Sequence, residues 1–174
     1  RAEAAEVIQG LRELGISKLV MMTGDNEKTA RSVAEAVGLT EFHAGVLPED
    51  KANYIRAEHA AGRKVIMLGD GVNDSPALSE ADVGIAIRDG AAIAREVADI
   101  TVGADNLYGL LTLKKLSDAL MARIHHNYRI IISFNFMLIC LGVAGILPPA
   151  TSALFHNAST LMISLRSMTN LLEA

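Results

Sequence analysis

Two carboxylates four positions apart, Asp70 and Asp74, are the residues whose type and spacing most clearly indicate chemistry. They follow an apolar run, Lys64–Leu68, that predicts a buried parallel strand. Carboxylate oxygens are hard ligands of the kind that Mg²⁺ prefers. The flanking glycines, Gly69 and Gly71, allow the backbone to turn sharply and to approach a phosphate closely. The segment therefore predicts a site for Mg²⁺ and a phosphate at the end of a strand.

A purely structural turn would need only the Gly-Asp-Gly sequence of this segment. The chain continues with a second polar pair, Asn73 and Asp74, which ligand binding explains and a turn does not. We therefore interpret Asp70 as a direct Mg²⁺ ligand, and Asp74 as a second ligand or as the residue that orients the waters of the ion.

Other groups needed for phosphoryl transfer occur earlier in the chain. Such a reaction requires a cation at the phosphate, donors for its oxygens and a nucleophile in line. Lys51 could bring an ammonium group to a phosphate oxygen, Thr23 offers a hydroxyl, and the amides of Gly24 and Asp25 offer two further donors. Each has a simpler alternative: Lys51 as a solvated surface lysine, and Thr23 as the cap of the helix that begins near Asn26.

The elements predicted around these residues alternate between strands and helices. Strands are expected at 19–22, 42–44, 65–68, 83–87 and 100–102, and helices at 5–14, 26–37, 48–60, after 74 and at 91–98. This alternation predicts an α/β fold with a parallel sheet and helices on both faces. Ligands of such sheets bind at the carboxyl ends of the strands. Thr23, Asp25, Asp70 and Asp74 all fall at such ends, which supports a single site.

The composition limits the classes of protein that fit. The 174 residues carry a net charge of −4, without the basic excess of a nucleic-acid-binding protein, so no nucleic acid partner is expected. A single cysteine, Cys140, excludes an intramolecular disulfide. Because the chain begins at Arg1 and within a helical pattern, it is expected to be a fragment of a longer protein.

The last third of the sequence predicts a transmembrane helical hairpin. A leucine stripe between 106 and 129 predicts a linking helix; residues 130–147 then contain no charge, which is about the length that spans a bilayer. Pro148 and Pro149 interrupt the pattern, and a second uncharged stretch follows at 150–165. Basic residues lie on the side away from the turn, so both ends are expected to face the cytoplasm. A buried hairpin of a soluble protein is the alternative.

Four segments together carry a family resemblance. They are Thr23–Asn26, Pro48–Lys51, Gly69–Leu78 and Ala81–Ala86. The chain resembles the phosphorylation domain of P-type ATPases, which has a haloacid-dehalogenase-like fold. The resemblance implies that Asp70 binds Mg²⁺, that Lys51 and Thr23 bind the phosphate, and that Asn73 and Asp74 complete the acidic loop.

The resemblance also implies parts that this sequence does not contain. In the family, ATP phosphorylates an aspartate in a DKTGT motif, and that motif would lie upstream of Arg1, with the nucleotide-binding domain, the actuator domain and earlier membrane helices. Mg²⁺ and ATP are thus the expected cofactors, and the fragment alone is expected to be inactive. The expected organisation is phosphorylation domain at 1–105, linking helix at 106–129 and transmembrane hairpin at 130–174.

A single hairpin after this domain is similar to the heavy-metal-transporting branch of the family. His156, Asn157, Ser159 and Thr160 place polar groups inside an apolar stretch, where such groups are costly and usually functional. We predict them as ligands of a transported ion, with Asn135 and Cys140 as possible contributors, although hydroxyls and amides also join membrane helices. An imidazole suits borderline divalent ions. Zn²⁺, Mn²⁺, Co²⁺, Ni²⁺, Fe²⁺ and Cu⁺ remain open as the cargo.

The interpretation is therefore part of an ATP-driven transition-metal pump in the plasma membrane, with its α/β domain in the cytoplasm and the lipid bilayer around its hairpin. Two alternatives stay open. One is a stand-alone phosphatase of the haloacid-dehalogenase-like superfamily, which would need a nucleophilic aspartate before the Thr23 loop and would not need a hairpin. The other is a non-catalytic membrane module.

Overall fold

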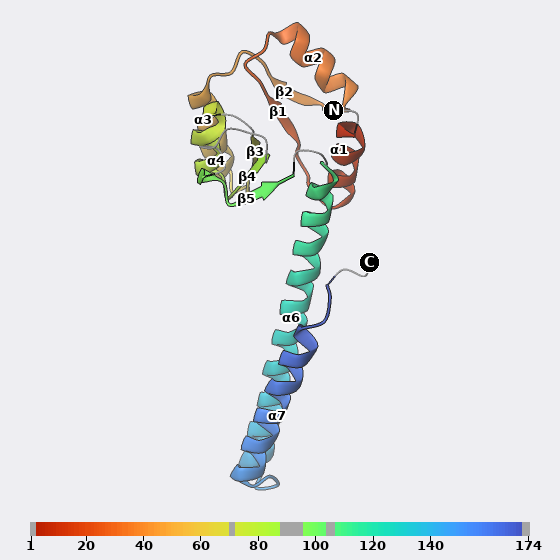
Figure 1. Ribbon diagram of the computed structural model, residues 1–174. Helices are drawn as coiled ribbons and strands as arrows, with labels where there is room; N and C mark the ends of the chain where they lie inside the picture. Colours follow the sequence, from red (N-terminus) through yellow and green to blue (C-terminus); the bar gives the residue numbers. More distant parts are fainter. Residues whose placement is uncertain (1–2, 70–71, 88–95, 104–106, 172–174) are drawn as a thin grey trace. The chain divides into compact units, whose positions relative to one another are not determined.

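A computed structural model describes residues 3–69, 72–87, 96–103 and 107–171 of the chain (Figure 1). The chain divides into two compact units, residues 1–112 and residues 113–174. The first unit contains the strands and the motifs of the predicted phosphate site, and the second contains most of the apolar helical hairpin.

The first unit alternates between helices and strands as predicted. Its elements are α1 (Ala4–Glu13), β1 (Val20–Met22), α2 (Glu27–Ala36), β2 (Glu41–His43), α3 (Pro48–Ala60), β3 (Ile66–Gly69), a 3₁₀ turn η1 (Val72–Asp74), α4 (Ser75–Glu80), β4 (Val83–Ile87) and β5 (Ile100–Val102). The helix predicted at 91–98 falls mostly outside the described residues.

The described strands form two groups, and every pairing is parallel. Strand β1 pairs with β2, and β4 lies between β3 and β5. Because the strands of each group run in one direction, the carboxyl end of β1 leads to the Thr23 loop and that of β3 leads to the acidic loop. The parallel α/β prediction is confirmed, with the phosphate-site motifs at strand ends.

The burial predicted for β3 is wrong on one of its faces. Ile66 is 53% exposed and Leu68 is 39% exposed, whereas Gly69 at the end of the strand is buried. Among the described residues β3 hydrogen-bonds to β4 alone, so it behaves here as an edge strand. The apolar run therefore predicted the presence of the strand correctly, but it predicted burial of side chains that are in fact exposed.

Helix α4 packs closely against the sheet. Leu78 is 1% exposed and Ala77 is fully buried. A side chain at Gly84 of β4 would place its Cβ 2.7 Å from the carbonyl oxygen of Leu78, a distance that requires glycine. Helix α3 packs beside α4 and contributes Ala52 and Ile55 to the core.

The apolar C-terminal region consists of α6 (Tyr108–Val143) and α7 (Pro149–Ser167). Helix α6 runs without interruption for 36 residues, so the predicted linking helix and the first predicted span form one helix. Pro149 occupies the first turn of α7, where its missing N–H costs nothing. At the other end of α7, Arg123 of α6 donates hydrogen bonds to the carbonyl oxygens of Ser167, Thr169 and Asn170.

In the part of the chain that the structure describes, α6 is the one helix long and apolar enough to cross a membrane by itself. Helix α7, which corresponds to the second predicted span, has 19 residues. Its central polar residues, His156 and Asn157, lower its hydropathy. A membrane position for α7 thus depends on its pairing with α6 and stays a prediction.

Candidate functional site

The Thr23 loop follows β1 directly and is held by a short local network. The Oγ1 of Thr23 donates to Oδ2 of Asp25 at 2.9 Å and accepts from the amide of Asp25 at 3.2 Å. The helix cap is Asn26, whose side chain accepts from the amide of Thr29 at 3.0 Å. The alternative that Thr23 caps α2 is therefore wrong. Gly24 is exposed beside these groups.

Lys51 lies on the first turn of α3 and contacts the acidic loop. Its Nζ is 2.7 Å from Oδ1 of Asp74, and the two side chains are only 13% and 11% exposed. Helix α3 begins at Pro48, and the carboxylate of Asp50 accepts from the amide of Leu47, which fixes this first turn. The alternative of a solvated surface lysine is wrong, because Lys51 is a largely buried cation paired with a buried carboxylate.

Asp74 lies close to Gly69, the last residue of β3. An added Cβ at Gly69 would lie 2.6 Å from the Cβ of Asp74, so the position of the Asp74 side chain depends on glycine at 69. Asp74 ends the 3₁₀ turn η1 and is 8% exposed, while Asn73 is exposed. The predicted Mg²⁺ ligand Asp70 and the neighbouring Gly71 lie outside the described residues.

Backbone hydrogen bonds connect the Thr23 loop to the start of α3. The amide of Val46 donates to the carbonyl of Thr23 at 3.0 Å, and the amide of Gly45 donates to the carbonyl of Asp25 at 2.8 Å. Residue 46 is followed by the N-cap of α3, Leu47. The structure therefore brings the Thr23 loop, the first turn of α3 and Asp74 into one region, as expected from their positions at strand ends.

The side chains of this region suit a magnesium ion in their chemistry. Asp74 and Asn73 supply carboxylate and amide oxygens, and the sequence predicts a further carboxylate from Asp70. Within the described ranges, no group of three or more His, Cys, Asp or Glu side chains is arranged to hold a metal ion.

In the hairpin, the predicted ion ligands divide into two kinds. Nδ1 of His156 lies 2.8 Å from Oδ1 of Asn135, so these two side chains connect α7 to α6. The hydroxyls of Ser159 and Thr160 instead donate to the carbonyl of His156 within α7, at 2.8 and 3.0 Å. Asn157 is exposed on α7. His156 and Asn135 thus form a hydrogen-bonded pair between the two helices. In the part of the chain that the structure describes, the hydroxyls of Ser159 and Thr160 bond only to a backbone carbonyl of α7.

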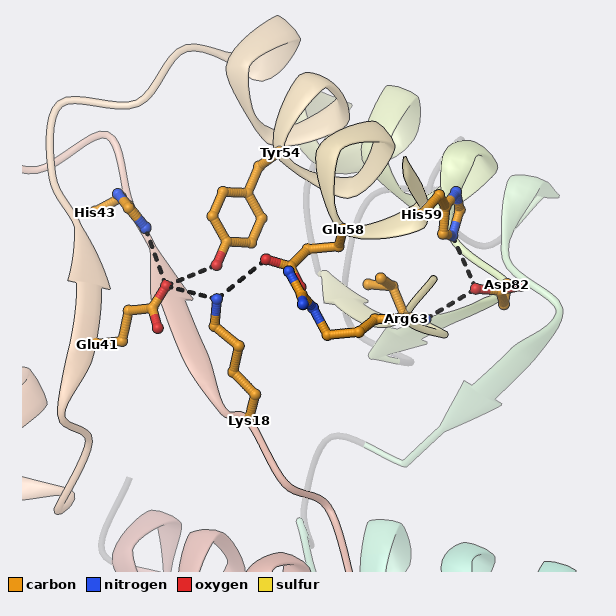
Figure 2. A network of polar contacts seen from close by, with 9 residues as sticks. Lys18, Glu41, His43, Tyr54, Glu58, His59, Arg63 and Asp82 are labelled. Atoms are coloured by element: carbon orange, nitrogen blue, oxygen red, sulfur yellow. Dashed lines mark hydrogen bonds and ion pairs between the residues drawn. The ribbon is translucent and has the colours of Figure 1, made fainter. Parts of the chain in front are cut away.

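A polar network around Lys18 was not predicted from the sequence (Figure 2). Nζ of Lys18, just before β1, lies 3.0 Å from Oε1 of Glu41 in β2 and 3.0 Å from Oε1 of Glu58 in α3. The hydroxyl of Tyr54 donates to the same oxygen of Glu41 at 2.7 Å. Arg63 pairs with the other oxygen of Glu58. Tyr54 and Glu58 lie four positions apart on one face of α3, but this spacing does not identify their partners Lys18 and Glu41.

The contacts of the network change the pKa values of its members. Tyr54, Glu41 and Glu58 together raise the pKa of Lys18 above its usual range. Hydrogen bonds from Arg63 and Lys18 lower the pKa of Glu58 to about 2. The Tyr54 hydroxyl is the main cause of a lowered pKa at Glu41. The ions of the network are therefore fully charged near neutral pH.

A second cluster, also visible in Figure 2, surrounds Asp82. Its carboxylate accepts from the amide of Val65 at 2.8 Å and from Nζ of Lys64 at 2.7 Å, and it contacts Nε2 of His59 at 2.8 Å. The hydrogen bond from Lys64 is the largest cause of a pKa for Asp82 well below its usual range. Asp82 therefore joins the C-terminal half of α3 to the segment that enters β3.

The fold of this chain has relatives among known proteins. The haloacid dehalogenase-like hydrolase family matches residues 1–82. The chain is 41% identical over 164 residues to a zinc-exporting P-type ATPase of Mycobacterium marinum, which covers 94% of this chain and 22% of that protein. It is also 41% identical over 164 residues to a manganese-exporting P-type ATPase of Mycobacterium leprae, with coverage of 94% and 23%.

A solved structure agrees with these relatives. The crystal structure of a zinc-transporting PIB-type ATPase in the E2.Pi state matches 99% of this chain with a TM-score of 0.91 and 34% identity, and the match covers 28% of that protein. The first unit thus has the haloacid-dehalogenase-like fold. Over nearly its whole length the chain is homologous to a part of metal-exporting P-type ATPases. It spans less than a quarter of the length of the curated relatives named above.

Proposed function

We propose that this chain is part of an ATP-driven transition-metal pump that works through an aspartyl-phosphate intermediate. The observation that carries the proposal is the largely buried pair of Lys51 and Asp74 beside the Thr23 loop, at the carboxyl ends of parallel strands. A cation, a hydroxyl and a carboxylate gathered there are the groups that phosphoryl transfer requires. The homology to metal-exporting P-type ATPases supports the same conclusion.

In this proposal each residue of the site has a distinct task. The ammonium of Lys51 neutralises charge on the transferred phosphoryl group, and the Thr23 hydroxyl and the Gly24 amide donate to its oxygens. In this structure the Thr23 hydroxyl donates its one proton to Oδ2 of Asp25, so the hydroxyl would turn from Asp25 to a phosphate oxygen when phosphate binds. Asp74 fixes the ammonium of Lys51 in place.

Asp70, Asp74 and the exposed Asn73 would hold Mg²⁺, which, when bound, offsets charge between the phosphate oxygens. The phosphorylated aspartate and the nucleotide-binding and actuator domains would belong to the rest of the parent protein. ATP would be bound there, and this chain would supply the phosphate-binding and ion-binding loops.

The hairpin would contribute to the path of the transported ion. His156 lies near the middle of α7 and pairs with Asn135 of α6, so its second ring nitrogen, Nε2, is the one directed to a ligand. Asn157, Ser159 and Thr160 would add oxygen atoms on or next to the same turn. The basic residues at the open end of the hairpin support a plasma membrane protein whose α/β domain lies in the cytoplasm.

The identity of the ion remains a question for experiment, since a zinc exporter and a manganese exporter match this chain equally well. ATPase activity of the complete parent protein in detergent should be measured with Zn²⁺, Mn²⁺, Co²⁺, Ni²⁺, Fe²⁺ and Cu⁺. Stimulation by one of these ions would support the pump and name its cargo. Phosphorylation by ATP without stimulation by any of them would contradict the assignment of a transition-metal cargo.

A further inference from the structure

Helix α3 connects the two groups of strands, and each of its sides has a separate set of contacts. Toward β3 and β4 it makes ion pairs through Arg56 with Glu80 and through His59 with Asp82. Toward β1 and β2 it is joined by Tyr54 and Glu58 to the network around Lys18. Its first turn carries Lys51. The position of α3 therefore determines how far the ammonium of Lys51 lies from the Thr23 loop.

The contacts on the β1 side converge on one ammonium group. Nζ of Lys18 bonds Glu41 and Glu58 and lies 5.3 Å from the centroid of the Tyr54 ring. Glu58 is only 8% exposed, so its charge requires compensation by Lys18 and Arg63. Because Lys18 lies two residues before β1 and Thr23 follows directly after it, a short strand connects this network to the phosphate loop.

The Lys18 network and Lys51 are connected through helix α3. On α3, Lys51 precedes Tyr54 by three residues and Glu58 by seven, so all three project from the same side of the helix, about two turns from end to end. A rotation or shift of α3 that followed loss of the Lys18 contacts would move Lys51 with it. The backbone bond from Val46 to Thr23 holds only the start of the helix.

We infer that Lys18, Tyr54 and Glu58 are positioning residues for phosphoryl transfer, because they fix α3 against β1 and β2 and thereby place Lys51 relative to the Thr23 loop. They do not touch the phosphate. The inference rests on the proposed role of Lys51 as a phosphate-binding residue. According to this inference, a network more than one helical turn away from the phosphate site helps to set the affinity of that site for the transferred phosphoryl group.

The test is inhibition of the complete pump by orthovanadate, a probe of the phosphate site. The variants are Lys18→Met, which removes the charge and keeps the aliphatic stem, Lys18→Arg, which restores a cation, and Tyr54→Phe, which removes one hydroxyl. Arg56→Ala is the matched control, because Arg56 is an exposed residue of α3 whose ion pair lies on the other side of the helix. Thermal unfolding of each variant is measured in parallel.

Lys18→Met should raise the vanadate concentration for half-inhibition about tenfold, since a displacement of about 1 Å is enough for effects of this order or larger. Lys18→Arg should recover most of this loss, Tyr54→Phe should give a smaller shift in the same direction, and Arg56→Ala should match the wild type. A lower melting temperature of Lys18→Met with unchanged vanadate sensitivity would overturn the inference and leave the network a purely structural role.

Lys51→Ala distinguishes a failure of the inference from a failure of the proposed function. If Lys51→Ala loses vanadate sensitivity while the Lys18 and Tyr54 variants keep it, the positioning role is wrong and the phosphate site stands. If Lys51→Ala keeps full sensitivity, Lys51 is not a phosphate-binding residue, and both the site assignment and the positioning role are overturned.

Discussion

Polar side chains of the α/β unit and of helix α7 find their hydrogen-bonding and ionic partners in different places. In the α/β unit, charged groups pair across elements distant in sequence, as Lys51 with Asp74 and Lys18 with Glu58. In α7, the hydroxyls of Ser159, Thr160 and Ser164 donate to carbonyls of their own helix. These charged groups of the first unit are therefore held by tertiary contacts, whereas the hydroxyls of α7 are held by their own helix.

Two polar residues of α7 pair with side chains of the other helix: His156 with Asn135 near the middle, and Ser167 with Asn127 at the end. A histidine whose Nδ1 is held by an amide oxygen presents Nε2 in a defined direction, which is the usual arrangement for a metal-ligating imidazole. The comparison therefore favours separate roles for the two regions. In the proposed pump, the α/β unit would bind the phosphoryl group through paired charges, and the hairpin would bind the ion through one oriented imidazole.

Removal of the Lys51 ammonium should have the largest effect. In the complete pump, Lys51→Ala should lower the rate of phosphoenzyme formation from ATP by about 100-fold or more, because a charged group at the transferred phosphoryl is lost. Asp74 would also lose its buried counter-ion. Rapid-quench measurement of phosphoenzyme checks this, with Arg56→Ala as the control. A rate within twofold of the wild type would contradict the role of Lys51.

Removal of the oriented imidazole should affect metal dependence and leave phosphate chemistry intact. His156→Ala should raise the metal concentration for half-maximal ATPase stimulation by a factor of about 10 to 100, and Asn135→Ala should give a shift toward the lower end of this range. Ser164→Ala, which removes a hydroxyl bonded to its own helix, is the matched control. An unchanged metal dependence of His156→Ala would assign His156 to helix packing.

A methyl group at Gly69 should disturb the first unit more modestly. The added Cβ of Gly69→Ala would lie 2.6 Å from that of Asp74, so Asp74 must move. We expect a loss of about 1–3 kcal/mol in the free energy of unfolding, as for other overpacked positions. Denaturant titration of the complete pump checks the stability. Gly103→Ala is the control, because an added Cβ there meets nothing within 4 Å.

The smallest expected effect is a pH dependence that belongs to the α/β unit. The pKa of Glu58 is about 2 in the folded protein against an ordinary value of 4.5, so its charge stabilises the folded state above pH 4.5. This contribution is lost as the pH falls toward 2. The melting temperature of Glu58→Gln should therefore lie below that of the wild type at pH 6 and approach it near pH 2. A difference that does not change with pH would contradict the assignment.

The sequence predicted most of the first unit because its signals are local. Pro48 and two early acids marked the start of α3, and alternating apolar segments marked β1 to β5. The glycine-flanked carboxylates marked the acidic loop, although Asp70 itself lies outside the described residues. These features depend on backbone conformation and on neighbours within a few positions, which a single sequence records.

The contacts between distant elements could not be predicted in the same way. Lys18 and Glu58 lie forty positions apart, and nothing in their local sequence distinguishes them from surface charges. The exposed face of β3 depends on which strands pair with it, which an apolar run does not specify. The pairing of Asn135 with His156 depends on the register between α6 and α7, and the sequence named both residues without joining them.

The separation of roles between the two regions is tested most directly by phosphorylation of the complete pump with radiolabelled inorganic phosphate, in the presence of Mg²⁺ and without the transported metal. In the proposed pump, this reaction would need the phosphate site and would not need ion binding in the hairpin. We predict that His156→Ala incorporates phosphate as the wild type does, while Lys51→Ala incorporates almost none. Equal incorporation by Lys51→Ala and the wild type, or loss of incorporation in His156→Ala alone, would contradict the account.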